Sequence, residues 1–212
     1  MATLDDKQIL RLLQPYLEGG PAAVAARLTP ERQQALVESL GVYLDLLVRW
    51  NERTNLTAIR QPEQIVQRHF GESLFAGLHL ADCLSADATL LDVGSGAGFP
   101  GLPIQLLESS WRVTLAESQN KKASFLREVV RTLGLTTEVH AARVETLAVD
   151  RRFAAVTLRA VDNMELAMRL AAERVEPGGW LAVLGGEELR AEGDQSFAVP
   201  GAEKSWLVLR RL

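Results

Sequence analysis

The 212-residue sequence contains a single cysteine, Cys83, and only three histidines, His69, His79 and His140. One cysteine cannot form a disulfide within the chain, and the histidines are not set at the short spacings typical of metal ligands, so we expect no structural metal. No stretch approaches the roughly 18 consecutive apolar residues that a membrane-spanning helix needs. The first residues, MATLDDKQIL, are acidic where a secretory signal would be basic, and we therefore expect a cytoplasmic protein.

The sequence also lacks an excess of positive charge. Lys and Arg number 23 against 27 Asp and Glu, a net charge of −4, which argues against a protein that coats nucleic acid without sequence preference. The charges are unevenly placed, because residues 112–159 carry nine basic and five acidic side chains, a balance of +4. Solvated faces commonly fluctuate by this much, but the segment would also provide a local anion-binding surface.

The first 85 residues follow a helical pattern. Thr29 is placed to cap a helix that begins at Pro30, and apolar residues from Leu36 to Val48 recur on one face. Shorter helices are expected over residues 4–17 and 62–80. We predict that residues 1–85 form a helical extension packed on a core domain of residues 86–212.

After residue 88, short apolar runs alternate with helical stretches. The runs predict strands over 89–94, 112–117, 137–142, 154–159 and 180–185, with helices at about 101–108, 119–133 and 163–175 between them. Apolar strands separated by helices are typical of a parallel, doubly wound sheet. The final runs SFAVPG (196–201) and KSWLVLRRL (204–212) predict a hairpin with an antiparallel strand. This is an α/β fold with the strand order of a class I methyltransferase, a Rossmann-like sheet closed by a C-terminal antiparallel hairpin.

The stretch LLDVGSGAGFPG (90–101) concentrates glycine where the first strand turns into a helix. Ligands of open α/β sheets bind beyond the carboxyl ends of the strands, so Gly94, Gly96 and Gly98 would let a ligand pack on backbone amides. The loop is not the dinucleotide fingerprint, because Phe99 stands where that motif has its third glycine. Asp92 at the strand end is placed to help orient an ammonium group, and S-adenosylmethionine carries such a group and no phosphate. The alternative is a purely structural turn.

An acidic residue, Glu117, ends the second predicted strand, 23 residues after Gly94. Nucleotide-binding α/β folds place a carboxylate at this position to accept hydrogen bonds from the ribose hydroxyls. The alternative is a strand-end carboxylate that caps the next helix. The glycine turn and Glu117 together predict nucleoside binding.

Two motifs of base methylation are missing. Methylation of a pyrimidine carbon needs a cysteine nucleophile, and Cys83 precedes the first strand, far from a site at the strand ends. Methylation of an exocyclic amine usually employs an Asn/Asp-Pro-Pro-aromatic stretch after the fourth strand, where this chain reads TLRAVDNM (157–164). A ring nitrogen already has a lone pair and needs neither device, since methyl transfer then depends mostly on positioning. Arg159 would orient the reactants, or it would be an ordinary salt-bridge partner.

Six segments resemble a known family in order and spacing: RWNERTNLTAIR (49–60), RHFGESL (68–74), LLDVGSGAGFPGLPI (90–104), ESQNKKASFL (117–126), ARVETL (142–147) and LRAVDNMELA (158–167). They are similar to the bacterial small-subunit ribosomal RNA methyltransferase G family, also called glucose-inhibited division protein B, over roughly residues 40–186. The resemblance implies a cytoplasmic enzyme that uses S-adenosylmethionine and methylates N7 of one guanine in the decoding region of small-subunit (16S) ribosomal RNA. Its partner would be this RNA or the small ribosomal subunit, with no membrane, and we expect a monomer.

The resemblance also implies roles for individual residues. It adds Phe99, Val144, Glu145 and Arg159 to the cofactor contacts, so that the candidate cofactor set is Asp92, Gly94, Gly96, Gly98, Phe99, Glu117, Val144, Glu145 and Arg159. The residues in family motifs that would face RNA are Trp50, Asn51, Asn55, Arg68, His69, Lys121 and Lys122. The two asparagines could equally cap helix ends, and His69 could be a packed helix histidine.

The sequence departs from the family pattern at four positions. Glu72 and Glu117 stand where the family has aspartate, Ala154 replaces an aspartate before the fourth strand, and Leu184 replaces a lysine after the fifth. The missing lysine removes a candidate substrate contact. Two other functions therefore stay open: methylation of a small metabolite, and a non-catalytic nucleotide-binding protein of ribosome assembly.

Overall fold

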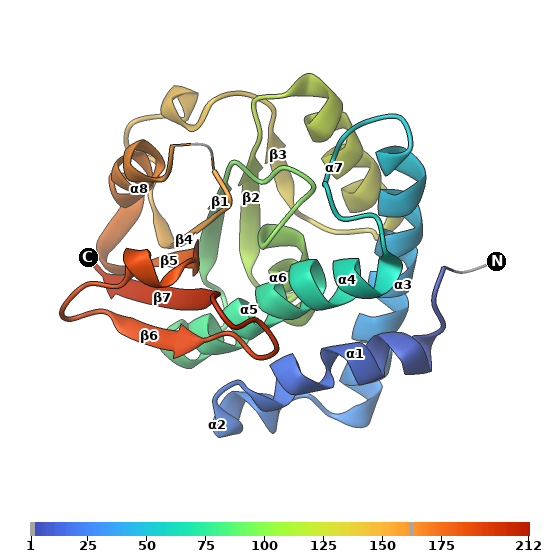
Figure 1. Cartoon of the computed structure of the whole chain (residues 1–212). Helices are drawn as coiled ribbons and strands as arrows, with labels where there is room; N and C mark the ends of the chain where they lie inside the picture. The colour runs from blue at the N-terminus through green and yellow to red at the C-terminus, as the bar shows by residue number, and fades with distance from the viewer. Residues whose placement is uncertain (1–2, 162) are drawn as a thin grey trace.

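A seven-stranded sheet forms the centre of the computed structural model, which describes residues 3–161 and 163–212 (Figure 1). The strand order is β3-β2-β1-β4-β5-β7-β6. The parallel strands are β1 (Thr89–Val93), β2 (Arg112–Ala116), β3 (Glu138–His140), β4 (Phe153–Arg159) and β5 (Val175–Gly185). β7 (Trp206–Arg211) is antiparallel to both β5 and β6 (Gln195–Ala198). The predicted doubly wound sheet with a C-terminal hairpin is confirmed.

The order of the strands reverses between β1 and β4, and this reversal positions the site. Ligands of open α/β sheets bind at such a switch point, beyond the carboxyl ends of the two strands. β1 runs into the glycine loop and then α6 (Gly101–Leu107), and β4 ends at Arg159. The loop and Arg159 are thus brought to the same edge of the sheet, as the strand predictions imply.

Each face of the sheet packs against its own hydrophobic core. Along β1, Leu90 belongs to one core and Leu91 to the other, because successive side chains of a strand point to opposite faces. The first core also holds residues of α6 and of α7 (Asn120–Thr132), and the second packs against α8 (Met164–Ala172). Two short 3-10 turns, η2 (Val144–Thr146) and η3 (Glu187–Leu189), follow β3 and β5.

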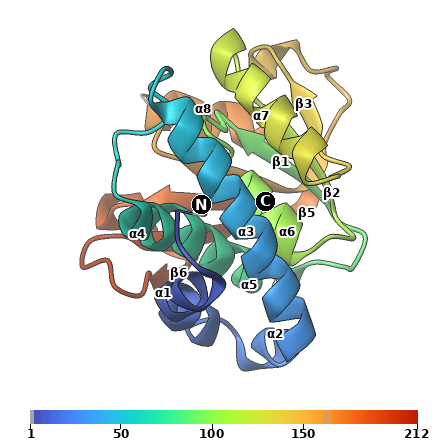
Figure 2. The ribbon, with the colours of Figure 1, turned by 90° about the vertical axis from the view of Figure 1, so that its right-hand side faces the viewer.

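The chain before the sheet is helical, as predicted. Its helices are α1 (Asp6–Glu18), α2 (Ala22–Ala25), α3 (Pro30–Asn51), α4 (Pro62–Ile65) and α5 (Glu72–Cys83). The side chain of Thr29 accepts a hydrogen bond from the backbone N–H of Arg32 and so caps α3, with Pro30 at its first position. In Figure 2 α3 crosses the near side of the molecule, beside α6 and α7 and above α1 and α2.

The N-terminal helices and the sheet share one hydrophobic core. Tyr43 and Leu47 of α3, Leu115 of β2 and Phe125 of α7 are all buried in it. This shared core joins the helical segment of residues 1–85 to the domain of residues 86–212. The division of the chain between these two parts stays a prediction.

A π-helical turn, η1 (Val66–Gly71), interrupts the helix that the sequence predicts over 62–80. A π turn widens the helix by one residue and often marks a functional site. Here it lies between α4 and α5 and carries Arg68 and His69.

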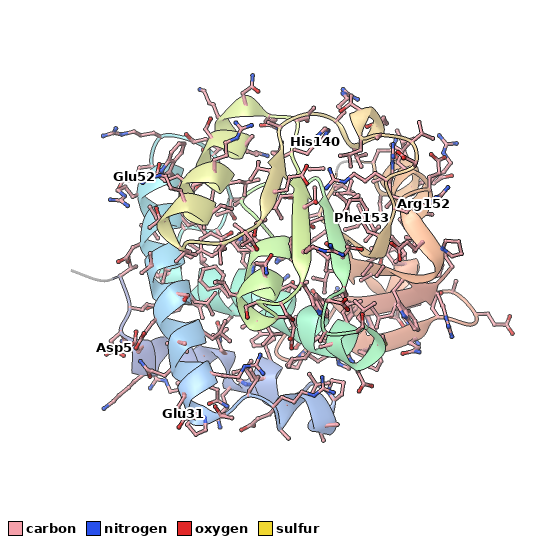
Figure 3. All side chains as sticks on the ribbon, turned by 180° about the vertical axis from the view of Figure 1, so that it is seen from behind. Asp5, Glu31, Glu52, His140, Arg152 and Phe153 are labelled. Carbon is pink, nitrogen blue, oxygen red and sulfur yellow. The ribbon has the colours of Figure 1, made fainter. Side chains whose placement is uncertain are left out.

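The ends of α3 and β3 lie at the same edge of the molecule. Figure 3 shows Glu52, just after α3, and His140, at the end of β3, at this edge, with Asp5 and Glu31 near the opposite edge. The loop of residues 52–60 therefore begins at the edge of the molecule where β3 ends. Within the described residues, no helix has the length and apolar character needed to cross a membrane.

Candidate functional site

The glycine loop after β1 is anchored by both β2 and α3. The backbone N–H groups of Gly94 and Ser95 donate to the carbonyl of Ala116 at the end of β2, at 2.9 and 3.2 Å. The buried hydroxyl of Tyr43, on α3, donates to the carbonyl of Ala97. Helix α3 thus helps to fix the shape of the loop.

The three glycines of the loop have different roles. All have positive φ, at +69° for Gly94, +59° for Gly96 and +97° for Gly98, a region that favours glycine. A Cβ at Gly98 would lie 2.5 Å from both Leu102 and the Tyr43 hydroxyl, and one at Gly94 would lie 2.9 Å from Val161. At Gly96 the nearest atom among the described residues would be the carbonyl oxygen of Gly94, at 3.8 Å. Gly98 is therefore required by packing, whereas Gly96 leaves open space for a ligand.

Asp92 lies beneath the loop, with none of its surface exposed. Its carboxylate accepts hydrogen bonds from the backbone N–H of Gly101 at 3.2 Å and from the hydroxyl of Thr157 at 2.7 Å. Burial raises the pKa of Asp92 to about 6, although these hydrogen bonds oppose the shift. The side chain links β1 to β4 and to the start of α6. Its predicted effect on the ammonium group of the cofactor would therefore come from supporting the glycine loop.

Glu117 holds the glycine loop against the start of α7. Its carboxylate accepts hydrogen bonds from the backbone N–H of Gly96 at 2.8 Å and from that of Gln119 at 2.7 Å, and the residue is buried. A carboxylate has about four acceptor positions, so two stay available for ribose hydroxyls. The capping role and the predicted ribose contact are compatible.

A cleft of about 260 Å³ opens beside the loop. It brings together predicted cofactor residues and predicted RNA residues from segments far apart in the sequence. Its lining consists of Leu56, Thr57, His69, Gly94, Ser95, Gly96, Ala97, Phe99, Lys122, Arg159 and Ala160.

Arg159 is held by a cluster of charged and polar groups behind the cleft. Its guanidinium Nη2 lies 3.2 Å from Glu72 Oε2 and donates to the carbonyl of Arg68 at 2.6 Å. Glu72 also pairs with Arg68, at 2.7 Å between Oε1 and Nε. Burial lowers the pKa of Arg159, and the negative charge of Glu72 opposes this. Arg159 is thus both a salt-bridge partner, as the sequence left open, and a residue of the cleft wall.

His69 is neutral, and its tautomer follows from its partners. Nδ1 lies 3.0 Å from Nη2 of Arg159, and because a guanidinium only donates, Nδ1 must accept. The ring proton is therefore on Nε2, which donates to the hydroxyl of Thr57 at 2.7 Å. Burial and the nearby Arg159 and Arg68 lower the pKa of His69 to about 3. The ring stacks on Phe99 with centroids 4.6 Å apart, so His69 is a packed histidine that also faces the cleft.

The side chain of Asn51 shapes the loop of residues 52–60. It is buried, its Oδ1 accepts from the backbone N–H groups of Leu56 and Thr57, and its Nδ2 donates to the carbonyl of Thr57. This favours the capping interpretation over the expected RNA contact, because the amide is used within the protein. Asn55 is exposed and accepts a hydrogen bond from Arg60 at 3.1 Å.

Several other predicted residues are not part of the lining of the cleft. Val144 and Glu145 lie in η2 after β3, and Lys121 is exposed in the first turn of α7. Trp50 donates from its indole N–H to Glu128 on α7 at 3.2 Å. Of the departures from the family pattern, Leu184 is buried in β5 and Ala154 lies in β4, where its N–H donates to the Thr89 hydroxyl.

Thr57 and Thr157 were missed by sequence reasoning. Thr57 follows the Asn-Leu pair of the segment RWNERTNLTAIR, and its place in this family motif could have marked it as a site residue. Nothing in the pattern of β4 marks the hydroxyl of Thr157 as the partner of Asp92. Across residues 3–161 and 163–212, no three His, Cys, Asp or Glu side chains are grouped to hold a metal ion.

The fold and the site define a class I S-adenosylmethionine-dependent methyltransferase. A solved structure of a hypothetical protein from Thermus thermophilus is 26% identical, with a TM-score of 0.54 over 66% of this chain and 83% of that one. The 16S rRNA N2 G1207 methyltransferase of T. thermophilus, solved with AdoMet and guanosine, is 18% identical, with a TM-score of 0.54 over 66% of this chain and 42% of that one. At this identity the likeness concerns the fold alone.

The comparisons of sequence identify the family of this chain. Residues 36–205 match the family described as rRNA small subunit methyltransferase G. The ribosomal RNA small subunit methyltransferase G of Stenotrophomonas maltophilia (strain K279a) is 40% identical over 172 residues, 78% of this chain and 79% of that protein. The enzyme of the same name from Sorangium cellulosum (strain So ce56) is 40% identical over 181 residues, 84% and 72%. The chain belongs to the rRNA small subunit methyltransferase G family, and the expected membership is confirmed.

Proposed function

We propose that this protein transfers the methyl group of S-adenosylmethionine to N7 of a guanine in 16S ribosomal RNA. The observation that carries the proposal is the geometry of the glycine loop: Gly96 leaves open space at the cleft, and its backbone N–H is hydrogen-bonded to the carboxylate of Glu117. The relatives named above are ribosomal RNA small subunit methyltransferases, which supports the same substrate class here.

The residues of the loop fit the cofactor. When bound, S-adenosylmethionine supplies an electrophilic methyl group on a sulfonium. Glu117 has acceptor positions left for the ribose hydroxyls, while Gly96 allows the close approach of the ligand to the backbone. Val144 and Glu145 would lie toward the adenine, and Phe99 and Arg159 would form the wall beside the reacting groups.

The chemistry expected at N7 fits the side chains that are present. Guanine N7 carries a lone pair on the major-groove edge, so its attack needs no general base and no covalent nucleophile. His69 lacks basicity, since burial and two arginines lower its pKa to about 3, and Cys83 lies at the end of α5. The protein's contribution would be orientation and the exclusion of water.

Basic side chains near the cleft support an RNA substrate. Lys122 lines the cleft, Lys121 precedes it at the exposed start of α7, and the side chain of Arg68, in the π turn, is half-exposed. Phosphate contacts from these residues would position a splayed guanine, as is usual when proteins act on bases in folded RNA. We also propose that the enzyme acts as a monomer in the cytoplasm.

The test is nucleoside analysis of RNA treated with the purified protein and S-adenosylmethionine. We expect 7-methylguanosine in 16S RNA from cells that lack this modification, and none in 23S RNA. Methylation of a small metabolite instead of RNA would overturn the substrate, and cofactor binding without any turnover would favour an assembly protein.

A further inference from the structure

We propose that the hydroxyl of Thr57 acts as a donor-only group that recognises O6 of the target guanine. This inference rests on the proposed function, because it assigns a specificity-determining contact to the same cleft. The observation behind it is a chain of hydrogen bonds that runs from Glu72 through Arg159 and His69 to Thr57.

Each link of this chain has a fixed direction. Glu72 holds Arg159, whose guanidinium can only donate, so Nδ1 of His69 must accept. The neutral ring then carries its proton on Nε2 and donates to Thr57 Oγ1. The buried ion pair thereby sets the direction of a hydrogen bond at the cleft wall.

The oxygen of Thr57 also accepts a second hydrogen bond. The backbone N–H of Ile59 donates to Oγ1 at 3.2 Å. A hydroxyl has two acceptor lone pairs and one proton, so both acceptor positions of Thr57 are in use and its proton stays free to donate. No described residue accepts that proton, and Thr57 lines the cleft.

The loop that carries Thr57 is rigidly supported. The buried side chain of Asn51 bonds both the N–H and the carbonyl of Thr57, at 3.1 and 3.0 Å. The ring of His69 is fixed by stacking on Phe99. The hydroxyl is therefore preorganised, a condition for discrimination between bases.

A donor-only hydroxyl matches guanine and opposes adenine. On the edge that presents N7, guanine has the O6 acceptor, whereas adenine has the N6 amino donor. A base that presents N7 to the methyl group presents this neighbouring group beside it. Thr57 would donate to O6 of guanine, whereas the N6 amine of adenine would face a donor with no free lone pair.

The carboxylate of the cofactor is the other acceptor that the Thr57 proton could meet. The charged Arg159 and the backbone N–H groups of the loop suit a carboxylate better, whereas a neutral hydroxyl suits a neutral carbonyl. The experiment separates these two acceptors by measuring cofactor affinity as well as base discrimination.

The test is a double-mutant cycle between the Thr57 hydroxyl and O6. An RNA fragment carries either guanine or 2-aminopurine, which keeps N7 and lacks O6, at the nucleotide that the wild-type protein methylates. We expect Thr57→Val to lower kcat/KM on the guanine RNA about tenfold more than on the 2-aminopurine RNA, the usual worth of one hydrogen bond. Any general loosening of the loop lowers both rates and cancels in the ratio.

The controls use residues of the same loop. Thr57→Ser keeps the hydroxyl and should restore the preference for guanine. Thr54→Val changes a threonine that lines a separate hollow beside Trp50, and it should leave the ratio unchanged. The affinity of Thr57→Val for S-adenosylhomocysteine should match that of the wild type.

Three results have distinct meanings. Equal losses on both RNAs with unchanged cofactor affinity would overturn the role of Thr57 in recognising O6. A loss of cofactor affinity that accounts for the whole effect would assign the hydroxyl to the cofactor carboxylate and also overturn the inference. If the wild-type protein methylates no RNA, the proposed function itself fails.

Discussion

Alanine at Gly96 should impair cofactor binding, whereas alanine at Gly98 should impair the fold. Both positions have positive φ, so an L-residue costs about 1–2 kcal/mol at either. At Gly98 the added Cβ would lie 2.5 Å from Leu102 and from the Tyr43 hydroxyl, and such overpacking costs about 1–3 kcal/mol more. We expect losses of unfolding free energy of about 1–2 kcal/mol for Gly96→Ala and about 2–5 kcal/mol for Gly98→Ala.

The two variants are compared by urea unfolding and by calorimetric titration with S-adenosylhomocysteine. The methyl group of Gly96→Ala projects into open space at the cleft, where it would meet the ligand. Its affinity should fall about 5- to 150-fold, the equivalent of about 1–3 kcal/mol of overpacking. The reasoning is refuted if Gly96→Ala binds the ligand as the wild type does, or if it loses as much stability as Gly98→Ala.

Three further predictions concern buried titratable side chains. Glu117→Ala should weaken cofactor binding by about 1–3 kcal/mol in calorimetry through loss of charge-assisted hydrogen bonds, and unchanged affinity would mean that the ribose is held elsewhere. Glu72→Gln should lower the unfolding free energy by about 3–5 kcal/mol, because it leaves the buried Arg159 without its charge partner, and a loss below about 1 kcal/mol would contradict the ion pair. Burial lowers the folded-state pKa of His79 to about 4, while the unfolded chain takes up this proton near pH 6.5. The wild-type protein should therefore lose about 2 kcal/mol of unfolding free energy through His79 between pH 7 and pH 5, and His79→Leu should abolish this part of the pH dependence. An unchanged pH profile in urea unfolding would refute this last expectation.

The sign of the pH dependence differs among the buried groups. Below pH 6.5 the unfolded state binds protons at His69 and His79 that the folded state takes up only near pH 3 and pH 4, so both histidines make the fold less stable as the pH falls. Asp92 acts in the opposite direction between about pH 4 and pH 6, because its raised pKa lets the folded state bind a proton first. His79 gives the cleaner test, since His69 and Asp92 also support the site.

The alternation of apolar runs and helices was sufficient to predict the sheet. Short strands with side chains buried on both faces leave an apolar run, and the hairpin is marked by the short turn between its strands. The start of β5 was wrong by five residues, because Pro177, Gly178 and Gly179 are turn residues by composition, yet the strand begins at Val175. The π turn η1 was also missed, since the apolar spacing of 62–80 suits an α-helix throughout.

Site residues could be predicted from the sequence where the residue type itself indicates a particular backbone conformation or a particular chemical role. The glycines of the loop and the strand-end Glu117 are of this kind, and the structure places them together. Partners depend on tertiary contacts, so the burial of Asp92 beneath the loop and the use of the Asn51 amide as a cap were not readable from spacing. The link from Arg159 through His69 to Thr57 joins β4, the π turn and a loop, three segments that only the fold brings together.

The measurement that tests the account most directly is methyl transfer to RNA at single-nucleotide resolution. Purified protein is incubated with labelled S-adenosylmethionine and unmodified 16S RNA, either free or in the small subunit, and the RNA is then reduced and treated with aniline, which cleaves at 7-methylguanosine. The account predicts label in 16S RNA and cleavage at one guanine, with both reduced in Gly96→Ala when S-adenosylmethionine is below the concentration that saturates the wild type. Label without cleavage, or label confined to 23S RNA, protein or a small metabolite, would contradict it.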